Sequence, residues 1–239
     1  IEPYYDNIGT KINNVSCEYV LYYSNDMDIV NISHENGKYI CVMKCPKRMM
    51  PHNKFHCILT ENNEIMIPYG TMVSPFYSSK ASPAWNYGAL GSIVGHEMCH
   101  GFDEDGVLYD AEGQRKKIWS KSDFRAFHKK TKALIDLYNK QKVCKKHVNG
   151  KKTLSENIAD LGGLGIALHA LKEHLQNENK TKEEILIAYR EFFTAFATSW
   201  RTLYREEKLS QSIETDRHSP AFLRVNMIVS QFDEWYEAF

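Results

Sequence analysis

The pentad His96-Glu97-Met98-Cys99-His100 places two imidazoles and a carboxylate at helical spacing. Residues four apart on a helix share a face, so His96 and His100 can reach one metal ion. Glu97 lies beside that face, where its carboxylate can hold a water bound to the metal. These residue types indicate a hydrolytic zinc site. Taken alone, the pattern fits a coincidence on a solvated helix about as well.

A third metal ligand must come from elsewhere in the chain, because a catalytic zinc ion usually takes three protein ligands and one water. Glu156 is the strongest candidate, and it lies four residues before Asp160, so both carboxylates share a helix face. One can bind zinc while the other accepts the free ring N–H of a ligand histidine. Asp103 could support the second histidine in the same way. The alternative is that Glu156 is only a helix-capping acid and Asp160 a solvated charge.

The pattern of polar and apolar residues predicts the helices that would carry these groups. Ser82-Pro83 can begin a helix with Pro at its first position, and apolar or small residues then recur at helical spacing to Phe102. The capping-box form indicates further helix starts at Ser120-x-x-Asp123, Thr153-x-x-Glu156 and Thr181-x-x-Glu184. The helices from Thr153 and Thr181 are expected to end near His174 and Tyr204, and shorter ones are expected from Ser219-Pro220 and over 231–239.

Residues 1–52 are rich in Tyr, Asn and β-branched residues, and short apolar stretches at 19–23 and 39–43 predict strands. Another strand is expected at 64–67. We therefore predict two parts, an N-terminal β-rich segment at 1–52 and a domain at 53–239 that carries the metal motif. The predicted fold class is α+β and mostly helical, with a small β portion at the front.

Length and composition describe an ordinary globular chain. It has 239 residues, 43% of them hydrophobic, and 30 basic residues balance 30 acidic ones. This composition argues against disorder. A net charge of zero gives no overall attraction to nucleic acid or anionic lipid, so we expect no nucleic-acid partner. No apolar run reaches the roughly 18 residues that a membrane span needs.

Other features bear on the location of the protein. The chain begins at Ile1, without an initiator Met or a signal peptide, which is typical of a processed or excised piece. Sequons at Asn14, Asn31 and Asn179 favour an extracellular protein. Six cysteines are too few for a disulfide-built scaffold at this length, and they do not define a pairing.

Three sequence blocks follow one another along the chain: Gly95-His-Glu-Met-Cys-His-Gly-Phe-Asp103, Glu156-Asn-Ile-Ala-Asp-Leu-Gly-Gly163 and Asp216-Arg-His-Ser-Pro-Ala-Phe-Leu-Arg224. In residue type, order and spacing they resemble the signature blocks of the neprilysin and endothelin-converting-enzyme family. The resemblance covers about residues 60–239. It implies a zinc endopeptidase catalytic domain of the gluzincin, thermolysin-like type that acts on small peptides.

The resemblance also implies a role for each matching position. One zinc ion per chain would be held by His96, His100 and Glu156, with Glu97 as the general base. His218 would donate a hydrogen bond to the oxyanion, and Asp216 would orient that imidazole. Asp103 and Asp160 would support the two ligand imidazoles. Arg224 would bind a carbonyl of the substrate, and an apolar pocket for a substrate side chain would be formed by Phe76, Ile93 and Trp200. The three pocket residues could equally be core residues.

The chain departs from this family in three ways. The family carries a large helical lobe ahead of the catalytic region, and residues 1–52 are too short to form it. Phe55-His56 stand where the family has an Asn-Ala pair that grips the substrate backbone, and the family's Cys-containing tail is missing after Phe239. A membrane tether outside this chain is compatible with the resemblance.

Two alternatives therefore stay open. One is a catalytically weak or inactive relative that acts as a binding or scaffold domain. The other is a helical interaction domain in which the blocks are coincidental, and that hypothesis predicts no bound zinc.

Overall fold

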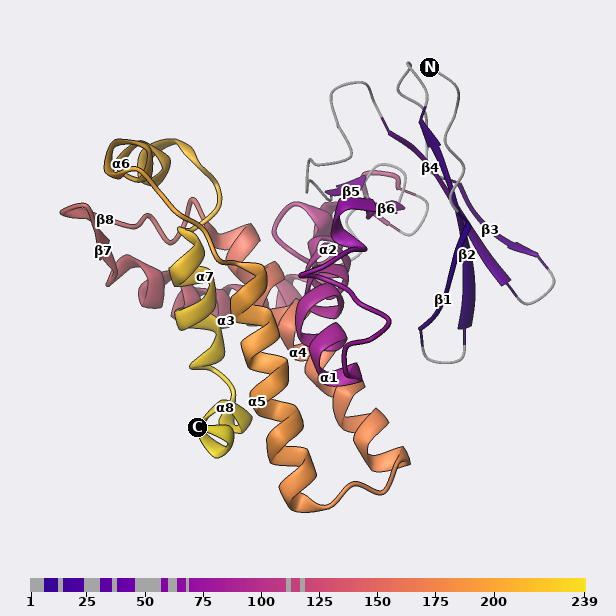
Figure 1. Cartoon of the computed structure of the whole chain (residues 1–239). Coiled ribbons are helices and arrows are strands. Elements are labelled where there is room, and N and C mark those ends of the chain that lie inside the picture. Colours follow the sequence, from indigo (N-terminus) through magenta and orange to yellow (C-terminus); the bar gives the residue numbers. More distant parts are fainter. Residues whose placement is uncertain are drawn as a thin grey trace. The chain divides into compact units, whose positions relative to one another are not determined.

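The computed structural model in Figure 1 describes residues 7–12, 15–23, 31–35, 38–45, 57–59, 64–67, 69–110, 113–116 and 119–239. The chain divides into two compact units, residues 1–59 with 64–73 and residues 60–63 with 74–239. The metal motif lies in the second unit. The domain boundary predicted after residue 52 stays a prediction, and Phe55-His56 lie outside the described residues.

The first unit contains a four-stranded sheet with the strand order β1-β2-β4-β3. Strands β2 and β4 are parallel, and each pairs with its outer neighbour in antiparallel fashion. The bounds are β1 (Asn7–Ile12), β2 (Val15–Tyr23), β3 (Asn31–Glu35) and β4 (Lys38–Cys45), followed by an antiparallel pair, β5 (Cys57–Leu59) and β6 (Glu64–Met66), and a 3₁₀ turn, η1 (Tyr69–Thr71). Strands β2, β4 and β6 confirm the strands predicted from the apolar stretches.

The second unit is mainly helical, in agreement with the predicted fold class. Its elements are α1 (Pro83–Asn86), the π-helical turn η2 (Tyr87–Gly91), α2 (Ser92–His100), η3 (Gly106–Leu108), α3 (Lys121–Asn139), the hairpin β7 (Lys142–Val143) and β8 (Lys146–His147), α4 (Leu154–Asn177), α5 (Lys182–Ser199), α6 (Glu206–Thr215), α7 (Ala221–Val229) and α8 (Asp233–Ala238). Helix α5 ends at Ser199, earlier than the predicted Tyr204, while α4 runs slightly past the predicted His174.

Local capping explains why three of the helices begin where the sequence predicts. The Ser82 hydroxyl accepts a hydrogen bond from the Trp85 N–H at 3.0 Å, with Pro83 at the first helical position. Ser120 and Thr181 each form a complete capping box with the acid three residues later. These contacts satisfy N–H groups that would otherwise lack a partner at a helix start.

The capping box predicted at Thr153 is wrong, although the helix does begin there. Thr153 makes no side-chain cap, and its hydroxyl instead donates to the Asn149 carbonyl and accepts from the Asn157 amide. Glu156 is therefore not held at the helix start. Its carboxylate turns toward His96 and His100, which rules out the alternative of a simple capping acid.

Helices α2 and α4 meet backbone to backbone through two glycines. A Cβ added at Gly95 would lie 2.6 Å from the Gly163 carbonyl oxygen, and one added at Gly163 would lie 2.3 Å from the backbone nitrogen of His96. No side chain fits between the helices there, because real Cβ atoms do not approach backbone so closely. This contact brings the helix that carries His96 against the helix that carries Glu156.

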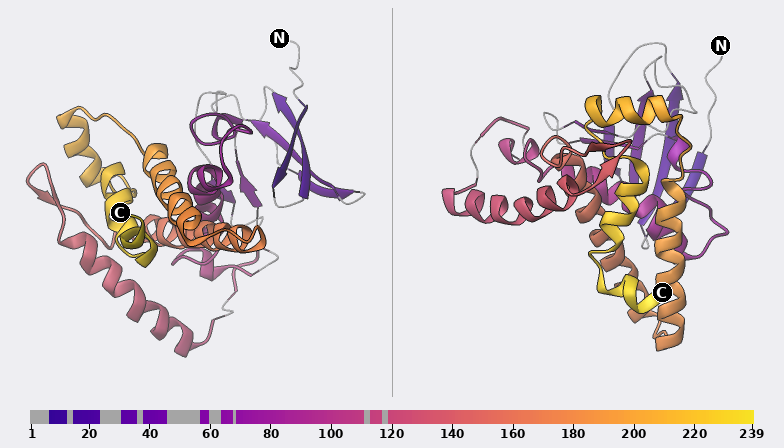
Figure 2. Two further views of the ribbon diagram at one scale, coloured as in Figure 1. Left: turned by 60° about the horizontal axis from the view of Figure 1, so that its bottom comes forward. Right: turned by 90° about the vertical axis from the view of Figure 1, so that its left-hand side faces the viewer.

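Two apolar clusters hold the other helices around this pair. The larger cluster joins α1, α4, α5, α7 and α8, with Phe192 and Phe193 fully buried at its centre. The smaller cluster joins α3, the β7–β8 hairpin, α6 and the start of α4 around the buried Tyr138. Helices α7 and α8 lie along one side of α5 in Figure 1 and in the right-hand view of Figure 2.

Helix α8 at the C-terminus is fixed by two polar contacts as well as by its apolar packing. Lys172 of α4 forms an ion pair with Glu234, and Arg190 of α5 donates to the Ala238 carbonyl. Within the described residues, no helix combines the length and the apolar character needed to cross a membrane.

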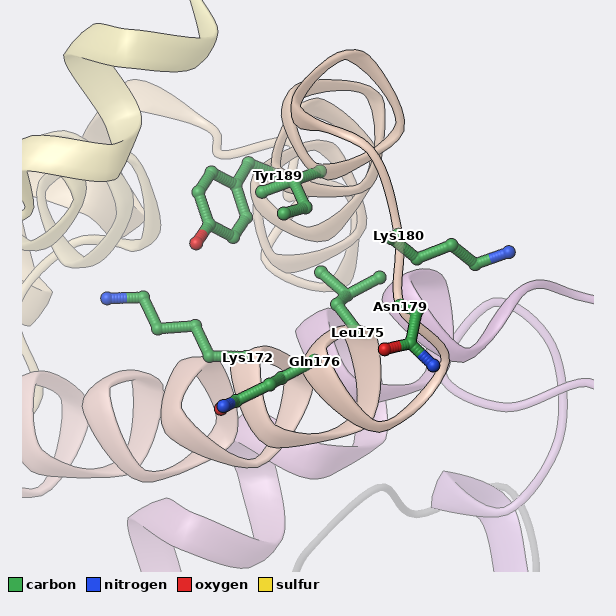
Figure 3. A pocket seen from close by; sticks show the side chains of 7 residues that line it. Lys172, Leu175, Gln176, Asn179, Lys180 and Tyr189 are labelled. Carbon is green, nitrogen blue, oxygen red and sulfur yellow. The ribbon is translucent and has the colours of Figure 1, made fainter.

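A cavity of about 420 Å³ lies at the turn between α4 and α5, away from the metal motif. Figure 3 shows side chains from both helices and from the turn around it. The residues lining it are Lys172, Leu175, Gln176, Asn179, Lys180, Ile185 and Tyr189. Its two lysines are already paired with glutamates, Lys172 with Glu234 and Lys180 with Glu178 and Glu184, so it offers no uncompensated charge to a ligand.

Replacing Gly163 by Ala should destabilise the protein, because the new Cβ would push α4 away from the His96 backbone. We expect the free energy of unfolding to fall by about 1–3 kcal/mol or more, measured by chemical denaturation. Gly165→Ala on the same helix is the control. A Cβ there meets only the Phe232 ring, at 3.7 Å, and helix propensity should stabilise the variant by up to about 1 kcal/mol. Equal destabilisation by both substitutions would contradict the close approach.

Candidate metal centre

Three ligand atoms from two helices form a small triangle. The Nε2 atoms of His96 and His100 on α2 are 3.1 Å apart. Oε2 of Glu156 on α4 lies 3.3 Å from the first and 3.6 Å from the second. Ligand atoms bound to tetrahedral zinc at about 2.0–2.1 Å are themselves about 3.3 Å apart. The triangle therefore has the dimensions of three corners of a zinc tetrahedron.

The far nitrogen of each imidazole is held by an aspartate. His96 Nδ1 lies 2.8 Å from Asp160 Oδ1, and His100 Nδ1 lies 2.7 Å from Asp103 Oδ2. Because a carboxylate only accepts, each Nδ1 carries the proton and each Nε2 can turn a lone pair toward the centre. Glu156 Oε2 is buried there without a hydrogen-bond donor in the described part of the chain. A donor set of two nitrogens and one carboxylate oxygen suits zinc.

Asp103 is fixed from four directions. Its Oδ1 accepts from the backbone N–H groups of Asp105 and Gly106, both at 2.8 Å, and its Oδ2 accepts from the Ser155 hydroxyl as well as from His100. Burial alone would raise the pKa of Asp103, but these hydrogen bonds lower it below its usual value. The side chain is therefore an anion that holds the His100 ring.

Asp160 is the corresponding support for His96 and is almost fully buried. Arg224 donates from Nε and from Nη2 to its two oxygens, both at 2.7 Å. Burial would raise the pKa of Asp160, but the Arg224 guanidinium and the His96 ring lower it to about 2. The guanidinium also lies over the Trp200 ring, 3.8 Å from its centroid. Such a two-pronged buried pair fixes both partners.

The surrounding carboxylates favour the protonated imidazoles. Burial lowers the pKa of His96, but Asp160 and Glu156 outweigh it and raise the pKa above its usual value. Burial is likewise outweighed at His100, where Asp103 and Glu156 raise the pKa to about 10. A bound cation acts in the opposite direction, because it competes with the proton for the same Nε2 lone pair.

Glu97 and His218 face this centre from two sides. Oε1 of Glu97 is 3.9 Å from His96 Nε2, and its side chain is buried. His218 Nε2 lies 3.2 Å from Glu156 Oε2, and its Nδ1 lies 2.8 Å from Asp216 Oδ1. The Glu156 carboxylate outweighs burial and raises the pKa of His218. One side chain can accept a proton at the centre, and the other can donate a hydrogen bond there.

Of the remaining predicted site residues, Phe76, Ile93 and Arg224 are buried and Trp200 is partly buried. One face of Trp200 is covered by Arg224. Arg224 itself is engaged with Asp160. The pocket and substrate roles of these four residues stay predictions.

Sequence reasoning missed three polar side chains around the centre. Ser155 bonds Asp103, and Asn157 bonds Ser219. Each of them stands next to a predicted site residue, but residue type alone does not distinguish such a partner from an ordinary polar side chain.

In this arrangement one helix supplies two fixed imidazoles and a buried glutamate, and a second helix supplies the third ligand atom. The class of protein that it defines is the zinc peptidases. A family model, described as peptidase family M13, matches residues 58–239. The chain belongs to peptidase family M13. This match confirms the resemblance to the neprilysin and endothelin-converting-enzyme group and the fold class that it implies.

Relatives of known name agree with that membership. An endothelin-converting enzyme homolog of Locusta migratoria is 37% identical over 183 residues, 74% of this chain and 25% of that protein. A neutral endopeptidase of Lactobacillus helveticus is 33% identical over 192 residues, 80% of this chain and 28% of that protein. The Mycobacterium tuberculosis zinc metalloprotease ZMP1, solved with an inhibitor, matches with a TM-score of 0.73 and 33% identity over 80% of this chain and 30% of that chain. The chain spans about a quarter of the length of the curated relatives it matches.

Two arginine–aspartate pairs in the same region should differ sharply in their effect on stability. Arg224→Met leaves the Asp160 charge buried without its main partner, so the free energy of unfolding should fall by about 3–5 kcal/mol. Arg217→Met breaks a pair with Asp105 whose side chains are 64% and 62% exposed, and it should cost no more than about 1 kcal/mol. Chemical denaturation of both variants in the same metal state measures the difference. Similar losses would contradict the assigned importance of burial.

Proposed function

We propose that this chain is the zinc-binding catalytic part of a metalloendopeptidase that hydrolyses small peptides. The observation that carries the proposal is the triangle of His96 Nε2, His100 Nε2 and Glu156 Oε2, with sides of 3.1, 3.3 and 3.6 Å. These three side chains would hold one zinc ion per chain. Two relatives are named an endothelin-converting enzyme homolog and a neutral endopeptidase, and these names support the proposal.

Zinc, when bound, supplies a Lewis acid that polarises a peptide carbonyl and lowers the pKa of water. Glu97 would take a proton from the attacking water and return it to the leaving amine. Its burial beside His96 keeps bulk water from competing for that proton. Asp103 and Asp160 would keep both ligand imidazoles in the tautomer that leaves Nε2 free for the ion.

His218 would donate a hydrogen bond from Nε2 to the oxyanion of the tetrahedral intermediate. Asp216 accepts from both the ring Nδ1–H and the backbone N–H of His218, so the imidazole is oriented before substrate arrives. Such a preorganised donor stabilises the charge that develops in the transition state.

The substrate roles belong to the same proposal. Phe76, Ile93 and Trp200 would border the pocket for the side chain that follows the scissile bond, and Arg224 would bind a backbone carbonyl of the peptide. Arg224 is well suited to a fixed contact, because Asp160 and Trp200 already hold its guanidinium.

Glu97→Gln should remove peptide hydrolysis while leaving zinc bound, since the amide keeps the shape of the side chain but cannot take a proton. We expect turnover of a short fluorogenic peptide to fall at least about 100-fold. Zinc content is measured on the same sample by elemental analysis. Glu173→Gln, on the exposed face of α4, is the control and should keep the wild-type rate.

A chelator should abolish the wild-type activity, and added zinc should restore it. Zinc bound at one ion per chain without any hydrolysis would favour the alternative of an inactive binding or scaffold domain. Absence of zinc would contradict the metal site itself.

We also propose an extracellular location, with a glycan on Asn179. This residue heads the sequon Asn179-Lys180-Thr181 in the turn between α4 and α5. It is exposed and has φ of 53°, a conformation that asparagine tolerates in turns. A glycan there would extend into solvent at the end of the helix pair, away from the metal centre.

Expression of the chain through a secretory pathway should yield a glycan on Asn179. Peptide mass spectrometry before and after glycosidase treatment would detect it, and Asn179→Gln should remove it. Asn177→Gln is the matched control, since Asn177 is also exposed but starts no sequon. An unmodified Asn179 in secreted protein would refute the assignment.

A further inference from the structure

We propose that the two neighbours of His218 are positioning residues. The loop that carries His218 spans residues 216–220, between α6 and α7. Ser219 holds this loop against α4, the helix of Glu156. Arg217 holds it against Asp105, which follows α2, the helix of the two ligand histidines. The inference rests on the proposed function, because it concerns what sets the distance between His218, the proposed oxyanion donor, and the metal centre.

The contacts within the loop do not fix that distance. Both hydrogen bonds from His218 to Asp216 join residues two apart, and both side chains are about half exposed. They set the direction of the ring relative to its own backbone. The position of the loop relative to Glu156 must come from contacts with other elements.

The inner contact is the hydrogen bond from Ser219 Oγ to Asn157 Oδ1, at 2.9 Å. Ser219 is 3% exposed and Asn157 is completely buried, so the bond has no competing water. Asn157 directly follows Glu156 on α4. A buried pair of this kind is costly to break, because water cannot replace the lost partner.

The orientation of the Asn157 amide is itself determined. Its Nδ2 donates to Thr153 Oγ1 at 2.9 Å, and that hydroxyl donates to the Asn149 carbonyl. The Thr153 oxygen is therefore the acceptor, and the amide oxygen of Asn157 is left to face Ser219. The chain of bonds explains why Thr153 does not cap α4, as noted above.

The outer contact is the ion pair of Arg217 Nη2 with Asp105 Oδ2, at 3.0 Å. Asp105 also donates its backbone N–H to Asp103, the residue that holds His100. Both side chains of the pair are exposed, so salt screens their attraction. The outer contact is accordingly the weaker of the two.

Together the contacts hold His218 from both sides against the segments that bear the ligands. His218 Nε2 lies 3.2 Å from Glu156 Oε2. A catalytic donor must be held within about 0.5 Å of its productive position, so small shifts of this imidazole matter. Loosening the inner contact should shift the imidazole without removing any group that touches the metal or the substrate.

Ser219→Ala tests the inner contact in the full chain. We expect kcat for peptide hydrolysis to fall about tenfold with KM and zinc content unchanged, since a small misplacement weakens transition-state contacts. Ser230→Ala is the control. Ser230 lies just past the C-terminal end of α7, where its hydroxyl donates to the Met227 carbonyl of that helix, and the rate should stay at the wild-type value.

A double-mutant cycle separates positioning from general damage. If Ser219 acts through His218, adding Ser219→Ala to His218→Gln should slow the enzyme no further. Two losses that multiply would overturn the proposal, because Ser219 would then affect the rate without His218.

The outer contact predicts a salt-dependent effect. Arg217→Gln should lower kcat about two- to threefold at low ionic strength, and the difference should disappear in high salt. The exchange Arg217→Asp with Asp105→Arg should restore the rate. An unchanged rate of Arg217→Gln at low salt would overturn the role of Arg217.

Amide hydrogen exchange tests, independently of activity, whether Ser219 holds the loop that carries His218. The amides of His218 and Ala221, bonded to Asp216 and to the Tyr204 hydroxyl, should exchange faster in Ser219→Ala than in Ser230→Ala. Unchanged exchange would contradict the positioning role. A wild-type chain without zinc-dependent hydrolysis would refute the proposed function alone, and the exchange result would still stand.

Discussion

The backbone contact between α2 and α4 is the constraint on which the site depends. Gly95 and Gly163 let the two helices approach with no side chain between them. His96 directly follows Gly95, and Glu156 lies two turns before Gly163 on α4. The separation of the helices therefore sets the distance between His96 Nε2 and Glu156 Oε2. A helix pair packed at ordinary side-chain distance would leave these atoms too far apart to share one ion.

The electrostatics of the site follow from that geometry. The contact buries carboxylates that each need compensation: Asp160 is compensated by Arg224, and Asp103 by backbone and hydroxyl donors. Glu156 differs, because the two ligand imidazoles beside its Oε2 direct their Nδ1 protons to Asp160 and Asp103 instead. A divalent cation is the natural complement to this remaining charge. Stability and metal binding are therefore linked through the same few side chains.

Much of the fold could be predicted because its signals are local. Ser82, Ser120 and Thr181 cap their helices through contacts within three residues, and the predicted starts are correct. Helix α6 lacks a side-chain cap at Arg205, so no comparable signal precedes it. The β7–β8 hairpin turns at Cys144-Lys145 with positive φ at both, where Asn-Gly would be the usual signal. Both missed elements are held by tertiary packing around Tyr138.

The difference between local signals and tertiary contacts applies to the candidate site as well. His96, His100 and Glu97 share one helix turn, and Glu156 and Asp160 share another, so their groups could be found from spacing. Ser219 and Asn157 are 62 residues apart and Arg217 and Asp105 are 112 apart, so these contacts exist only once the blocks meet. Apolar residues pose a different problem, because a pocket wall and a core position require the same side chains. Short motifs identify the residues that can carry out the chemistry. The positions of the hydrogen-bond donors depend instead on polar pairs that join those motifs in the folded chain.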